Sequence, residues 1–205
     1  MSAVVVGDGA VGGGAGEDAE GVDSVVLGVA IPVPSPHSGI LVDERRRSGD
    51  PEALLVPPHI TLLPPIRVPQ AELSRIEQHL AGAAAAVAPF AVHLSGTGTF
   101  RPVSQVVFVQ VAAGLSGCEQ LESRVRCGPL ARELTFPYHP HVTIAQDVAP
   151  AALDRAYESL QDFVARFRVS AFTMFQRGKD GAWVPKREFP LGAGRAGAGA
   201  GGQLG

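Results

Sequence analysis

The tetrapeptide Pro-His-aliphatic-Thr occurs twice in the chain, once at His59 and again at His141. Aliphatic residues follow each copy, so each one predicts a buried strand that carries a polar histidine and a polar threonine. Because side chains alternate between the two faces of a strand, His59 and Thr61 share a face, and so do His141 and Thr143. Two such strands facing each other would surround one small cavity with two imidazoles and two hydroxyls.

The spacing of 82 residues between the two histidines also relates other parts of the chain. It places the apolar run at 25–30 on the apolar run at 107–112, with Gly28 opposite Gln110 as the mismatch. The order strand, helix, motif strand, helix, strand therefore appears twice. This pattern predicts an α+β fold of two lobes, built from duplicated β-α-β-α-β units with pseudo-two-fold symmetry and a central cleft carrying both motifs.

Hydrophobic periodicity and turn residues define the other expected elements. Strands are expected at 25–31, 57–68, 90–94, 105–112, 138–148, 166–175 and 183–189, and helices at 35–47, 69–87, 115–134 and 150–164. Residues 1–22 and 192–205 are rich in Gly and Ala, and we expect them to form flexible tails. The remaining residues, 23–191, are expected to form a single bilobed domain, with lobe one at about 23–100 and lobe two at about 101–191.

The composition suits a soluble globular protein, with 45% hydrophobic residues, 18% charged residues and a net charge of −3. Such a balance provides no overall electrostatic attraction for nucleic acid. The start of the chain lacks a basic signal-peptide region, and no apolar run is long enough to cross a bilayer. We therefore expect a cytoplasmic protein without membrane contact, and a monomer.

A matched pair of histidines suits acid–base chemistry on a phosphate ester. Cleavage of a phosphodiester, or opening of a 2′,3′-cyclic phosphate, removes a proton from the attacking oxygen and delivers one to the leaving oxygen. Two imidazoles can do both at one pH, because imidazole titrates near neutrality. The nearby threonine hydroxyls can donate hydrogen bonds to the non-bridging oxygens. This division of labour needs neither a metal nor a cofactor, whereas a purely structural role would not require a matched pair.

These residues resemble the 2H phosphoesterase superfamily, and within it the 2′-5′ RNA ligase and cyclic phosphodiesterase branch. The segment 138–143, Tyr-His-Pro-His-Val-Thr, is especially similar to the second motif of that branch. The resemblance implies a bilobed fold, metal-independent catalysis, and substrates with 2′,5′ linkages or 2′,3′-cyclic phosphate ends. It also implies that His59 and His141 are the catalytic pair and that Thr61 and Thr143 bind the substrate phosphate. We expect His59 to protonate the leaving group and His141 to act as the base.

The expected partner is an RNA end or a small nucleotide with a cyclic phosphate. Since the chain is acidic and no basic residue directly precedes the first motif, a small nucleotide is as compatible as RNA. The alternative is a non-catalytic nucleotide-binding or RNA-end-binding module of the same fold, which would not require two titrating groups. An acyl-transfer enzyme is disfavoured, because neither Cys118 nor Cys127 lies in a nucleophile-elbow sequence.

Three further groups of residues were considered for the site. A metal site at His139 and His141 is disfavoured, because no carboxylate or cysteine lies nearby at a ligand-like spacing, so we expect His139 to orient its neighbour or lie on the surface. The arginines at 45–47 suit a solvated helix end, with phosphate contact as the alternative. Trp183 and Phe175 have basic neighbours on the last hairpin; a core role for Trp183 is favoured over base stacking.

Overall fold

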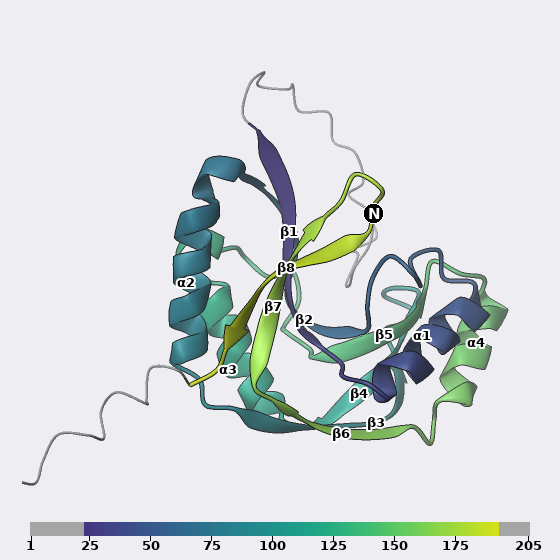
Figure 1. The fold of residues 1–205 in the computed structure, drawn as a ribbon. Helices are drawn as coiled ribbons and strands as arrows, with labels where there is room; N and C mark the ends of the chain where they lie inside the picture. The colour runs from purple at the N-terminus through teal and green to yellow at the C-terminus, as the bar shows by residue number, and fades with distance from the viewer. Residues whose placement is uncertain (1–22, 193–205) are drawn as a thin grey trace, which may run out of the picture.

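Strands and helices alternate along residues 23–192, the part of the chain that the computed structural model describes (Figure 1). The strands are β1 (Ser24–Pro32), β2 (His59–Pro69), β3 (Phe90–Thr99), β4 (Val106–Ala113), β5 (His141–Gln146), β6 (Val164–Val169), β7 (Ala171–Arg177) and β8 (Trp183–Pro190). The α-helices are α1 (His37–Ser48), α2 (Leu73–Ala85), α3 (Leu115–Val125) and α4 (Pro150–Ser159). Apart from Gly192, the expected tails lie outside the described residues.

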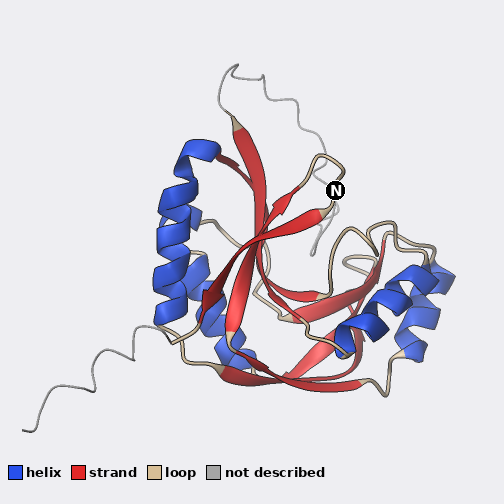
Figure 2. Cartoon of the chain, viewed as in Figure 1, coloured by secondary structure: helices blue, strands red, loops and turns tan. Residues whose placement is uncertain are grey.

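The strands form two antiparallel sheets, drawn in red in Figure 2. The first sheet has the order β2-β1-β7-β8, and the second has the order β5-β4-β3-β6. Each motif strand, β2 or β5, therefore lies at the edge of its sheet. The inner strands are exchanged between the halves of the chain, since β3 pairs with β4 and β7 pairs with β1. The expected boundary near residue 100 is thus not a boundary between the sheets.

The helices are exchanged between the sheets as well. Helix α1 connects two strands of the first sheet but packs with α4 against β5 of the second. Helix α3 connects two strands of the second sheet but packs with α2 against β2 of the first. In Figure 1 the pair α2 and α3 and the pair α1 and α4 lie on opposite sides of the molecule. Each motif strand is therefore entered from a helix that is packed on the other sheet.

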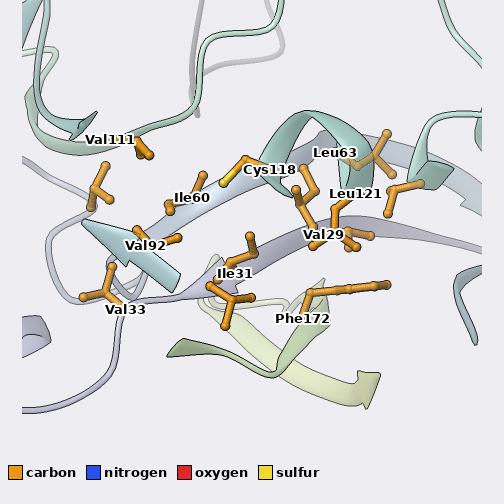
Figure 3. Close-up of a cluster of buried hydrophobic side chains, with 14 of the residues drawn as sticks. Val29, Ile31, Val33, Ile60, Leu63, Val92, Val111, Cys118, Leu121 and Phe172 are labelled. Atoms are coloured by element: carbon orange, nitrogen blue, oxygen red, sulfur yellow. The ribbon is translucent and has the colours of Figure 1, made fainter. Parts of the chain in front are cut away.

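Both sheets and all four helices contribute to one continuous hydrophobic core, part of which is shown in Figure 3. On α2, Ile76, Leu80 and Ala84 recur at helical spacing and are buried, as the sequence pattern predicts. On β5, every residue after His141 is buried, because both faces of this strand are covered. The core therefore supports the motif strands directly.

Three element boundaries differ from the sequence predictions. Gly96, expected to help end a strand, has a φ of 69° and lies within a register shift, so β3 continues past it. The helix expected to reach Leu134 ends with α3, shortly before Gly128, which has a φ of 56°. The single strand expected at 166–175 is two strands, β6 and β7, because the chain crosses there from the second sheet to the first.

Candidate active site

Each motif histidine is the first residue of its strand, and a nearby backbone carbonyl holds its ring. Nδ1 of His59 lies 2.7 Å from the carbonyl oxygen of Pro57, and Nδ1 of His141 lies 2.7 Å from that of His139. A carbonyl oxygen can only accept a hydrogen bond, so Nδ1 carries the proton in both rings. Nε2 is therefore the atom of each neutral imidazole that has a lone pair for proton transfer.

The two motif threonines also occupy equivalent positions. Thr61 pairs with Ala30 on β1, and Thr143 pairs with Phe108 on β4. The register shifts immediately after each threonine, so that one extra residue forms a β-bulge in each motif strand. A bulge bends its strand and redirects the side chains around it. The two half-sites thus share their local backbone shape as well as their sequence.

This register corrects the sequence alignment of the repeat. Since Ala30 and Phe108 face equivalent threonines, β1 and β4 correspond at an offset of 78 residues. The offset of 82 residues holds for the motif strands alone. The predicted match of 25–30 with 107–112 is therefore wrong by four residues, because the connection from the neighbouring strand to the motif strand is longer in the second half.

The structure brings the two half-sites together at the junction of the sheets, where β2 contacts β5. A hydrogen bond also crosses this junction: the phenol of Tyr138 donates to the carbonyl oxygen of Thr61 at 2.9 Å. Thr143 is buried and Thr61 is half-buried. The four residues that the motifs single out therefore lie on two strands in contact, two on each strand.

Aromatic rings surround the second histidine. The ring centroids of Phe100 and Phe108 lie 5.0 and 5.1 Å from that of His141. The ring of His139 lies 6.0 Å from His141 and 5.4 Å from each phenylalanine. Packing and the backbone hydrogen bond together restrict the orientation of His141. His139 is exposed, and its backbone carbonyl orients the neighbouring imidazole, which agrees with the orienting role expected for it.

The first histidine instead borders a pocket. The pocket lining includes His59 and Thr61 from β2, Gly28 from β1, Phe175 from β7 and Trp183 from β8. Its described lining contains no Lys or Arg, and neither the histidine nor the threonine of the second motif belongs to it. The two half-sites therefore differ: rings pack around one histidine, whereas an aromatic-walled space lies beside the other.

Trp183 is the main feature of this pocket that the sequence prediction assigned differently. A core role was favoured, but the side chain is half-buried and forms part of the pocket wall. A Cβ atom at Gly28 would lie only 3.1 Å from Cζ3 of Trp183, so the indole packs closely on the glycine backbone. Gly28, which breaks the apolar run at 25–30, was the sequence signal for this close approach.

The arginine run at 45–47 is only partly solvated. Arg45 is 1% exposed and forms an ion pair of 2.9 Å with the buried carboxylate of Asp50. Asp50 also accepts a hydrogen bond from the backbone N–H of Glu52 at 2.9 Å. The following two arginines are exposed, as expected. Arg45 therefore anchors the segment that leads into the first motif, because the chain reverses after α1 and brings Asp50 back to it.

Cys118 is fully buried in the core. Burial, with a smaller contribution from Glu119, raises the pKa of its thiol to about 12, so the thiol stays protonated and is a poor nucleophile. Within residues 23–192, His, Cys, Asp and Glu side chains form no group of three or more that could hold a metal ion. No helix in this described range is long and apolar enough to span a membrane.

A family model described as the 2′-5′ RNA ligase superfamily matches residues 32–181, a range that contains both motifs. The chain belongs to this superfamily. The resemblance to 2H phosphoesterases is thereby confirmed. A candidate phosphoesterase of Bacillus cytotoxicus is 31% identical over 153 residues, which cover 73% of this chain and 87% of that protein. A candidate phosphoesterase of Bacillus cereus is 30% identical over the same length.

Solved structures similar to this superfamily member share its fold. E. coli LigT in its apo form has a TM-score of 0.55 and 21% identity, with 82% of this chain and 98% of LigT covered. LigT complexed with 3′-AMP has a TM-score of 0.55 and 18% identity, with coverage of 82% and 99%. A protein of Thermus thermophilus has a TM-score of 0.54 and 24% identity, with coverage of 82% and 98%. The expected α+β fold with two sheets and duplicated units is confirmed.

Proposed function

We propose that the chain is a metal-independent phosphoesterase that opens 2′,3′-cyclic phosphates or cleaves 2′-5′ phosphodiester bonds in RNA or nucleotides, with His59 and His141 as its acid/base pair. The observation that carries this proposal is the equivalent tethering of the two imidazoles through Nδ1. It makes Nε2 the proton-transferring atom of both rings. Membership of a superfamily with phosphoesterase relatives supports the same chemistry.

The difference between the half-sites supports an orientation for the substrate. If the nucleoside of a 2′,3′-cyclic phosphate occupies the pocket beside His59, the leaving ribose oxygen faces that histidine, and water attacks phosphorus from the side of His141. Nε2 of His141 removes a proton from the water as the new P–O bond forms. Nε2–H of His59 gives its proton to the ribose oxygen as the old P–O bond breaks. The product is a nucleoside monophosphate, and the two imidazoles have exchanged protonation states.

The other residues of the site bind the substrate in this proposal. The hydroxyls of Thr61 and Thr143 donate hydrogen bonds to the non-bridging oxygens, where negative charge grows in the transition state. Trp183 and Phe175 provide aromatic surface for the nucleobase. Since no Lys or Arg belongs to the described pocket lining, the pocket favours a nucleotide or an oligonucleotide end over a long RNA backbone.

Turnover of nucleoside 2′,3′-cyclic phosphates tests the proposal. The substitutions His59→Ala and His141→Ala should each lower kcat by about 10²-fold or more, since each removes one positioned proton-transfer group. His37→Ala, on the first turn of α1 and outside the pocket lining, is the matched control and should keep its activity. Incubation with EDTA should leave wild-type turnover unchanged. Full activity in either site variant would contradict the mechanism.

The same assay separates the enzyme from a non-catalytic binding module. Binding of the cyclic nucleotide is measured calorimetrically beside product formation, with the wild-type protein in both experiments. Binding together with product formation supports the enzyme. Binding without any product would instead favour a module that uses the same pocket for recognition alone.

A further inference from the structure

We propose that Tyr138 is a positioning residue that sets the placement of the two half-sites relative to each other. Tyr138 lies three residues before His141, and its phenol donates a hydrogen bond of 2.9 Å to the carbonyl oxygen of Thr61. The bond therefore joins the approach to the second motif with the backbone of the first. This inference rests on the proposed function, because it concerns the geometry needed for that reaction.

The properties of the phenol suit a permanent link. Burial raises the pKa of Tyr138 well above its ordinary value, and nearby acidic groups, including Glu122, act in the same direction. The phenol therefore keeps its proton and remains a hydrogen-bond donor across the pH range in which imidazoles titrate. The accepting group is a backbone carbonyl, so the bond restrains the strand itself and not only a side chain.

The segment before Tyr138 is attached to the first sheet at a second place. The guanidinium of Arg126, which follows α3, donates a hydrogen bond to the carbonyl oxygen of Arg132. Arg126 is held in turn by an ion pair of 3.0 Å with Glu122 on α3. Because α3 packs against β2, this network and the Tyr138 phenol both fix the approach to the second motif against the first sheet.

Such a restraint matters because the reaction requires both Nε2 atoms on opposite sides of one phosphorus atom. A displacement of about 1 Å in a catalytic group can lower the rate by about 10²-fold. The two motif strands lie at the edges of different sheets, so no shared strand ladder holds them together. The Tyr138 hydrogen bond provides a directional contact across this junction.

The substitution Tyr138→Phe removes the phenolic oxygen and keeps the ring. We expect kcat for a nucleoside 2′,3′-cyclic phosphate to fall by about 10-fold while KM changes little, because in-line geometry matters most in the transition state. Thr97→Val is the matched control, since the Thr97 hydroxyl donates a comparable bond of 2.9 Å to the carbonyl of Tyr157 on α4. Equal kcat values for the two variants, measured well below their unfolding temperatures, would overturn the inference.

Two further measurements separate this inference from the proposed function. In a cycle with Thr61→Ala, adding Tyr138→Phe should lower kcat by clearly less than it does in the wild type, because the hydroxyl it positions is already absent. Losses that simply multiply would refute the positioning role. Calorimetric titration with inorganic phosphate needs no turnover: Tyr138→Phe should weaken binding several-fold relative to Thr97→Val, and unchanged affinity would count against the inference. A wild-type protein that binds phosphate but opens no cyclic nucleotide would refute only the proposed function.

Discussion

The indole of Trp183 packs on the backbone of Gly28, and both residues line the pocket beside His59. Strand β7 separates β1 from β8, so the indole extends across a neighbouring strand to reach the glycine. A side chain at position 28 would occupy the space that the ring fills. This contact determines how much aromatic surface the pocket presents to a ligand.

Removing the indole should weaken substrate binding. A base stacked on an aromatic side chain contributes about 1–3 kcal/mol, so Trp183→Ala should raise KM for a cyclic nucleotide by about 10-fold or more, with a smaller change in kcat. Trp183→Phe should recover part of this loss. Phe136→Ala, which removes an exposed ring outside the pocket lining, is the control. An unchanged KM in Trp183→Ala would show that the base does not stack there.

Enlarging Gly28 should disturb the pocket without touching either histidine. In Gly28→Val the new Cβ would lie 3.1 Å from Cζ3 of Trp183, so the ring must move. Trp183 is the only tryptophan of the chain, so its fluorescence reports this movement directly. We expect a red-shifted emission and a raised KM. Wild-type emission combined with wild-type KM would show that the pocket absorbs the added methyl groups.

Breaking the ion pair between Arg45 and Asp50 should destabilise the fold. Arg45→Met leaves the Asp50 carboxylate buried without its charged partner, which typically costs about 3–5 kcal/mol. Urea unfolding measures the loss. The control is Arg47→Met, which removes an exposed partner of Glu44 and should cost less than about 1 kcal/mol. Similar unfolding midpoints for the two variants would mean that the Arg45 pair is not a major anchor.

The two cysteines should differ in reactivity. Cys127 is exposed, so a thiol reagent at pH 8 should modify one cysteine per native chain and two per unfolded chain. Reaction of both thiols in the native protein would contradict the burial of Cys118.

The raised pKa of Cys118 also predicts an alkaline loss of stability. Folding favours the protonated thiol, so its contribution is complete below the ordinary pKa of 9.0 and is lost as the pH rises toward about 12. Cys118→Ala, which has no thiol to ionise, should lose less unfolding free energy than the wild type between these pH values. Parallel pH profiles of the two proteins would rule out this contribution.

The sequence by itself determined the local features of this protein. The alternation of His59 and Thr61 on a strand, and the recurrence of Ile76 and Leu80 on a helix, follow from backbone geometry within a few residues. The repeated motif also indicated the superfamily, because two copies of a short polar pattern in apolar strands are easily recognised. Helix ends and strand breaks were less certain, since glycines such as Gly96 can occur in a bulge as well as in a turn.

Only the tertiary structure decided which distant segments meet. The exchange of β3 and β7 between the sheets, the packing of Trp183 on Gly28 and the hydrogen bond from Tyr138 to Thr61 each join residues far apart in the chain. Local patterns do not specify such pairings, because they depend on how whole sheets and helices share one core. The residues of the candidate site were therefore visible in the sequence, whereas its pocket and the contacts between its two halves came from the fold.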